Sequence, residues 1–166
     1  MGARVPIAGP SDRPVGWCSW DYFGSAVTEA DVNRNVAALQ PLAAQDPSLR
    51  TAVVQIDDGF QPAIGDWLAP KASFPSGMET MASQIAASGF RPGVWLAPLL
   101  LGEGSTVLRE HPEFALKSTD GSTLLVDTWL GRCAVLDCTA PAAAEWLSNL
   151  VQRVVRDWGY TYLKLD

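Results

Sequence analysis

The sequence predicts an α/β protein that forms part of a TIM (β/α)8 barrel, with roughly the first four strands and three helices. Short apolar runs alternate with helical patterns along the chain, which is typical of parallel strands joined by right-handed crossovers. No Gly-x-Gly-x-x-Gly or Gly-x-x-x-x-Gly-Lys-Ser/Thr loop follows any run, which disfavours a nucleotide-binding doubly wound sheet. A complete barrel typically needs about 250 residues, whereas this chain has 166.

The first part of the chain contains a lead-in and two predicted strands. Residues 1–14 are rich in glycine and proline and are expected to be flexible, so the barrel portion is assigned to 15–166. An apolar run at 15–20 predicts the first strand. A helical pattern at 28–40 begins with capping-box spacing and is expected to end before a proline. The continuously apolar run at 51–56 predicts a second strand, covered on both faces.

A second helix is predicted to begin at Ser76, with Glu79 completing a capping box and Gly89 just beyond its end. The run at 93–97 predicts the third strand.

A long loop is expected at 102–138, with a short strand at 133–136. Loops of this size usually carry function or cover a site. Thr139 is expected to cap an amphipathic helix that ends at Gly159, and the run at 160–165 predicts the fourth strand.

Composition excludes several classes of function. The formal net charge is -6 and no Lys/Arg run occurs, which disfavours a nucleic-acid partner. No apolar stretch approaches about 18 residues, which disfavours a membrane partner. The N-terminus lacks the apolar segment of a signal peptide, so a cytoplasmic location is expected. The three cysteines have no CxxC spacing, so no zinc site, disulfide framework or other cofactor is predicted.

Polar and aromatic residues follow each apolar run, where the carboxyl edge of a parallel barrel holds the active site. Asp and Gly often end strands for structural reasons alone, but their recurrence at four successive strand ends favours a site. The candidate residues at these ends are Trp20, Asp57, Asp58, Trp95, Lys164 and Asp166.

The adjacent carboxylates of Asp57 and Asp58 can accept several sugar hydroxyls. A metal site is the weaker interpretation, because no His stands near. Lys164 and Asp166 share one face of their strand. A neighbouring ammonium favours the ionised carboxylate that a nucleophile needs, and a structural ion pair is an equally good interpretation. Arg132 either reaches the site from the long loop or is simply exposed.

Seven motifs occur in one order along the chain. They are Gly16-Trp17-Cys18-Ser19-Trp20, Ile56-Asp57-Asp58-Gly59-Phe60, Gly65-Asp66-Trp67, Phe74-Pro75-Ser76-Gly77, Gly93-Val94-Trp95-Leu96-Ala97-Pro98, Glu110-His111-Pro112-Glu113-Phe114 and Tyr162-Leu163-Lys164-Leu165-Asp166. Together they resemble the first half of the catalytic barrel of the α-galactosidases (melibiases) of glycoside hydrolase family 36. The resemblance extends from about Val15 to the last residue.

The resemblance implies a retaining hydrolase of terminal α-linked galactose in which Asp166 is the nucleophile. Lys164, Asp57 and Asp58 would bind galactose hydroxyls, and Arg132 would contact the site. Trp20, Trp67 and Trp95 would complete the sugar site. The implied ligand is an α-galactoside or related oligosaccharide, without a metal.

Retaining hydrolysis also needs a second carboxylate as acid/base, which the family carries downstream of the nucleophile. The chain by itself is therefore expected to be inactive. Two departures concern substrate preference: Ala97 stands where many members have Glu, and Arg132 lacks the usual preceding Asn. The alternatives are a galactosyltransferase of the raffinose-synthase type and a non-catalytic half-barrel that self-associates through its exposed edges.

Overall fold

The computed structural model describes residues 14–129 and 131–166, and a four-stranded parallel sheet forms its centre. The strands, in spatial order, are β1 (Gly16–Cys18), β2 (Val53–Ile56), β3 (Arg91–Leu96) and β7 (Tyr162–Leu165). The predicted partial α/β fold is confirmed, and the sheet is open within the described residues. Most of the expected lead-in, residues 1–13, lies outside them.

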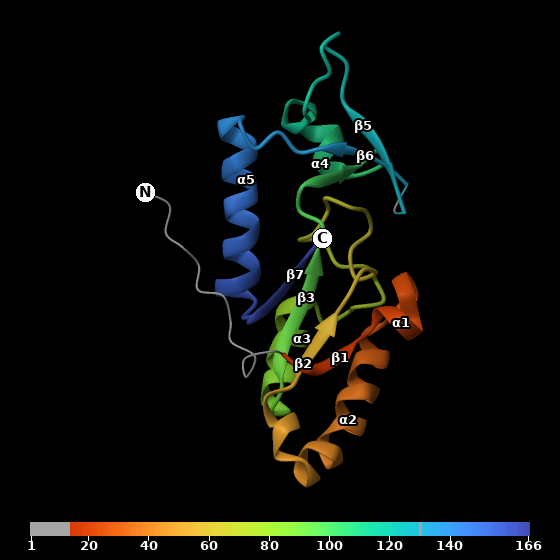
Figure 1. Cartoon of the computed structure of the whole chain (residues 1–166), viewed down its shortest axis with the longest axis vertical. Helices are drawn as coiled ribbons and strands as arrows, with labels where there is room; N and C mark the ends of the chain where they lie inside the picture. Colours follow the sequence, from red (N-terminus) through yellow and green to blue (C-terminus); the bar gives the residue numbers. More distant parts are fainter. Residues whose placement is uncertain (1–13, 130) are drawn as a thin grey trace.

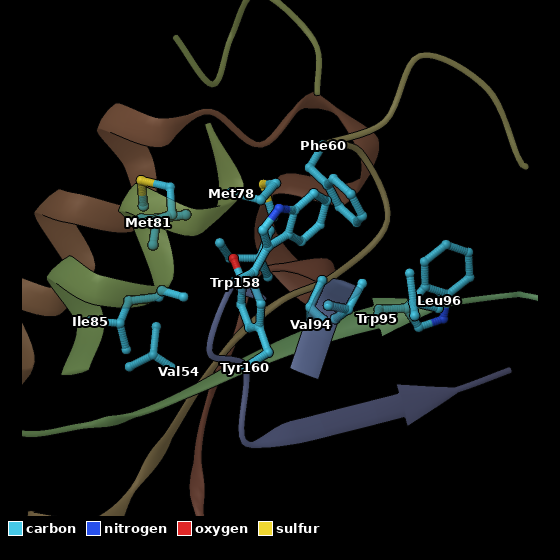
Figure 2. Close-up of a cluster of buried hydrophobic side chains, with 14 of the residues drawn as sticks. Val54, Phe60, Met78, Met81, Ile85, Val94, Trp95, Leu96, Trp158 and Tyr160 are labelled. Atoms are coloured by element: carbon cyan, nitrogen blue, oxygen red, sulfur yellow. The ribbon is translucent and has the colours of Figure 1, made fainter. Parts of the chain in front are cut away.

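Three long helices connect the parallel strands and cover one face of the sheet (Figure 1). They are α2 (Glu29–Gln45), α3 (Met78–Ala87) and α5 (Pro141–Gln152). Alternation along the strands turns Val54 and Val94 toward these helices. Figure 2 shows side chains of α3 gathered with these valines, Trp158 and Tyr160 in a buried cluster. The opposite face of the sheet carries both apolar and polar side chains.

Shorter helical segments join these elements. They are α1 (Trp20–Phe23), α4 (Thr106–Glu110), the 3-10 helices η2 (Gly24–Ala26), η3 (Pro47–Thr51) and η4 (Pro112–Phe114), and the π-helical turn η5 (Arg153–Asp157). In the described part of the chain, no helix has the length and apolar character needed to cross a membrane.

A second, antiparallel sheet lies beyond the carboxyl ends of the parallel strands (Figure 1). Its strands, in the order β4-β6-β5, are β4 (Leu100–Gly102), β6 (Gly131–Val135) and β5 (Leu125–Thr128). The short strand predicted at 133–136 is present as part of β6, but the prediction of a long loop around it missed β4 and β5. This sheet has its own core, which includes Leu101 and Phe114.

Two helix boundaries differ from the prediction for identifiable reasons. The capping box of Thr28 and Asp31 is present, but α2 continues through Pro41 to Gln45. Pro41 is exposed, so water can reach the helical carbonyl that proline leaves without a donor. The expected first strand at 15–20 is shorter, because α1 begins at Trp20.

Ser76 and Thr139, the two other residues predicted to cap helices, donate hydrogen bonds to nearby carboxylates instead. The backbone N–H and hydroxyl of Ser76 both donate to Glu29, at 2.9 and 2.8 Å, and α3 begins at Met78 after Gly77. The backbone N–H and hydroxyl of Thr139 both donate to Asp137, so α5 begins one residue later than that cap would allow. In each case a nearby carboxylate accepts the donors of the expected cap.

Candidate functional site

A cavity of about 350 Å³ lies where β2, β3 and β7 reach their carboxyl ends. Its lining consists of Trp20, Asp57, Asp58, Trp95, Trp129, Lys164 and Asp166. Six of the eight residues singled out from the sequence therefore meet here. Arg132 and Trp67 lie elsewhere, and Trp129 is an addition.

The parallel register brings these side chains together. Trp95 of β3 is the register partner of Lys164 in β7, so the two side chains leave the same face of the sheet. Asp166 lies two residues beyond Lys164 and shares that face. On the other side, Gln55 of β2 pairs with Gly93, and Asp57 follows two residues later. Residues far apart in the sequence thus converge on one edge.

Asp57 is 2% exposed and forms the centre of a hydrogen-bond network. Its Oδ2 accepts from Lys164 Nζ at 2.9 Å, from Gln55 Nε2 at 2.5 Å and from the Cys18 thiol at 3.4 Å. Its Oδ1 accepts from the backbone N–H of Asp58 at 2.9 Å. These four donors hold the Asp57 carboxylate in one orientation.

Two other groups in the network titrate above their ordinary range. Burial raises the pKa of the Cys18 thiol, and the Asp57 charge adds to this, so the thiol stays protonated and can donate. Burial alone would lower the pKa of the Lys164 ammonium. The hydrogen bond to Asp57 and the charge of Asp57 together outweigh it, so the Lys164 pKa is raised. Lys164 is therefore a cation throughout the physiological range.

Asp58 is held by the tight turn that follows β2. Gln61 donates from its side-chain amide to Asp58 Oδ1 and accepts from the backbone N–H of Gly59. Gly59 has φ of +127°, and a Cβ there would lie 2.7 Å from the carbonyl oxygen of Ser25. Only glycine fits this turn without strain, and the turn directs Asp58 to the cavity lining.

Asp166 accepts a hydrogen bond from the indole Nε1–H of Trp95 at 3.0 Å. Trp95 is itself 1% exposed and packs edge-on against Trp67, with ring centroids 5.7 Å apart. The carboxylate is thus oriented by a side chain that has little freedom to move. A carboxylate held in one orientation beside an open cavity has the geometry that a nucleophile needs.

A larger cavity, of about 490 Å³, adjoins the first and shares Trp20, Asp58 and Trp129 with it. Arg132 lines this second cavity, 3.9 Å from a carboxylate oxygen of Glu103 and 3.8 Å from one of Asp127. The structure therefore places Arg132 beside the first cavity rather than in it.

Trp129 was missed by the sequence analysis. It follows β5 in the turn toward β6 and is 62% exposed, yet it lines both cavities. The available signal was an aromatic residue close to Gly131 and Arg132 in the long loop. Without the antiparallel hairpin, nothing indicated that this residue would reach the ends of the parallel strands.

Trp67 is 1% exposed, and the structure does not bring it to the cavity of Asp166. It packs between Trp95 and Phe60, so its contact with the site passes through Trp95. His111 stacks on Phe114, with ring centroids 4.5 Å apart, and its Nδ1 lies 3.1 Å from Glu113 Oε1. Among residues 14–129 and 131–166, no group of three or more His, Cys, Asp or Glu side chains is arranged to hold a metal ion.

Comparison with known proteins gives consistent matches. A family model described as Melibiase matches residues 13–166. The chain is 29% identical to the myogenesis-regulating glycosidase of Mus musculus, over 99% of this chain and 22% of that protein. It is 25% identical to alpha-galactosidase C of Emericella nidulans, over 94% of this chain and 22% of that protein.

A solved structure extends the likeness to the fold. TtGalA, an alpha-galactosidase from Thermus thermophilus in complex with stachyose, superposes with a TM-score of 0.80 at 34% identity. The match covers 92% of this chain and 32% of that one. The chain thus spans about a fifth of the length of the two curated relatives and about a third of this structure.

Proposed function

The chain belongs to the melibiase family, and on this premise we propose that it carries the galactose-binding part of a retaining α-galactosidase site, with Asp166 as the nucleophile. The observation that carries the proposal is the single cavity in which Asp166, Lys164 and Asp58 meet Trp20 and Trp95. Ionised, cationic and aromatic groups around one small cavity are what a sugar with several hydroxyls and one apolar face requires.

Each residue has a separate role in this proposal. The Asp166 carboxylate attacks the anomeric carbon, and the Trp95 N–H keeps it aimed. Lys164 and Asp58 bind hydroxyls as donor and acceptor. Trp20 supplies an aromatic surface on which the sugar ring lies. Arg132 binds the part of the ligand that extends into the adjoining cavity.

Retaining chemistry needs a second carboxylate to protonate the leaving sugar and then activate water. The family resemblance puts that group beyond Asp166, so we expect this chain by itself to bind an α-galactoside without turning over raffinose. A substrate whose leaving group needs no proton tests the nucleophile without the help of a general acid.

The test uses 5-fluoro-α-galactosyl fluoride, whose fluoride leaves without protonation. An Asp166 carboxylate oxygen forms a bond to C1 while the C1–F bond breaks and fluoride departs with the electron pair. We expect one covalent adduct by intact-mass measurement, located on Asp166 by peptide mapping and absent from Asp166→Asn. An adduct on another residue, or none on a folded wild-type chain, would overturn the assignment of the nucleophile.

Self-association is a second point of the proposal. Within the described residues, β1 and β7 each pair with one neighbour and leave one edge of the sheet open. Leu165 on β7 is 60% exposed. Open edges with apolar side chains favour pairing with another strand, so we expect the isolated chain to form dimers or larger species. A monomer mass, measured by light scattering at micromolar protein concentrations, would contradict this expectation.

A further inference from the structure

We infer that Gln55 is a positioning residue whose amide fixes Asp57 against Lys164 and so holds the Lys164 ammonium in place for the sugar. The inference rests on the proposed function for the identity of the ligand. None of the seven sequence motifs includes Gln55. The inference also gives the adjacent residues Asp57 and Asp58 different roles.

The first argument counts the acceptor sites of Asp57. An ionised carboxylate has about four lone-pair sites. In this protein Gln55, Lys164 and Cys18 donate to one oxygen, and the Asp58 backbone N–H donates to the other. Oδ2 is therefore crowded by three donors, whereas Oδ1 accepts one hydrogen bond and keeps an acceptor site. Gln55 thus acts on the same oxygen that anchors the Lys164 ammonium.

The second argument is that the fold makes room for Gln55. Its side chain lies on the same face of β2 as Asp57 and is 7% exposed. The register partner on β3 is Gly93, where a Cβ would lie 3.3 Å from Gln55 Cα and 2.7 Å from Val53 Cγ1. On the other side, Cys18 is the register partner in β1.

The Gln55 amide nitrogen carries two hydrogens, and each has an acceptor. One bonds Asp57 Oδ2, and the other bonds Cys18 Sγ at 3.3 Å. Cys18 in turn donates its thiol hydrogen to the same Asp57 oxygen. Gln55 therefore holds the carboxylate directly and through the thiol, which limits rotation of Asp57 about its side-chain bonds. Lys164, 39% exposed, is the member of this network that can extend into the cavity.

Asp58 provides the contrast within the same turn. In the described part of the chain its side chain accepts one hydrogen bond, from Gln61, and it lines both cavities. It retains acceptor capacity for a ligand hydroxyl. Both aspartates line the cavity of Asp166, but only Asp57 also anchors the Lys164 ammonium.

The test uses Gln55→Met in the full chain, which keeps the volume of the side chain and removes both donors. Galactose is titrated while the indole N–H signals are followed by NMR. We expect binding to weaken about tenfold, the order of one hydrogen bond to a charged group. Gln84→Met, the same change at an exposed position of α3, serves as the matched control and should bind like the wild type.

A ligand-free measurement keeps the inference separate from the proposed function. Urea midpoints are measured for Gln55→Met, Lys164→Met and the double variant. If Gln55 holds Asp57 on Lys164, losing Lys164 should shift the midpoint about half as much once Gln55 is replaced, because interacting residues are not additive. Gln55→Leu, which also removes both donors and adds no charge, provides the same comparison if the methionine variant does not fold.

The two measurements distinguish failure of the Gln55 role from failure of the proposed function. Additive midpoints together with galactose binding within twofold of wild type would overturn the role of Gln55 and leave the proposed function intact. Non-additive midpoints in a chain that binds no galactose would overturn the proposed function and support the anchoring of Asp57 by Gln55.

Discussion

Replacing Lys164 by Met should lower the free energy of unfolding by about 2 kcal/mol. Removing one partner of a fully buried ion pair costs about 3–5 kcal/mol. Here the Asp57 side chain is 3% exposed but that of Lys164 is 39% exposed, so part of the pair is already screened by water. Asp57 also keeps three other donors. The loss should therefore approach that of one hydrogen bond to a charged group, about 1.5–3 kcal/mol.

Urea unfolding followed by circular dichroism measures this effect. With a slope of about 2 kcal/mol per molar urea, the midpoint should fall by about 1 M. Arg153→Met is the matched control, because Arg153 and Asp157 also pair at 2.9 Å but are 55% and 51% exposed. Its cost should stay below about 1 kcal/mol. Equal losses in the two variants would refute the argument that burial of Asp57 sets the magnitude.

The contribution of Lys164 to the free energy of unfolding should depend on pH in a defined direction. The pKa of Lys164 is raised above its ordinary value of 10.5 in the folded chain. The stabilisation is therefore complete below that value and is lost as the pH rises through the folded pKa. The difference in unfolding free energy between wild type and Lys164→Met should be constant from pH 7 to 9 and shrink above 10.5. A difference that grows with alkaline pH would contradict the sign of the shift.

Three further predictions concern residues around the site. Cys18 should react with iodoacetamide at pH 8 more slowly than the exposed Cys138, because burial raises the Cys18 pKa; equal rates by peptide mass spectrometry would oppose this. Gly59→Ala should lower the urea midpoint more than Gly89→Ala, since both have positive φ but only Gly59 has backbone within 3 Å of the added carbon. Trp129→Ala should weaken raffinose binding at least threefold by NMR titration and leave the midpoint unchanged, and a destabilised variant would show that this exposed side chain supports the fold.

The parallel strands were predictable because their signal is local. Runs such as 51–56 are apolar on both faces, and each ends in polar residues that the register then brings together. Placing Asp57, Lys164 and Asp166 at one edge needed only the alternation of side chains and the parallel order of strands. The cavity that they line is the outcome of that regularity.

The antiparallel sheet and the contacts of Trp129 and Gln55 could not be predicted, because they depend on segments that are distant in the sequence. The antiparallel sheet has short strands with mixed polar and apolar residues, so no periodicity stood out before Leu101 and Phe114 were seen in a common core. Without that hairpin, Trp129 had no predicted place. The role of Gln55 was hidden because a glutamine in an apolar run carries no motif. Its partner Cys18 lies 37 residues away along the chain.

The two hydrophobic cores meet at Trp146 and Leu147 of α5, and Cys133 of β6 belongs to the core of the parallel strands. Segments with few buried apolar contacts open locally before the rest of a fold. β5 has no buried residue, whereas every residue of β2 is buried, so β5 and the turn with Trp129 should open while the parallel strands stay packed. Amide hydrogens of β5 and β6 should then exchange with deuterium before those of β2 and β3. In this way the entrance to the cavity would open and close at a smaller energetic cost than its floor.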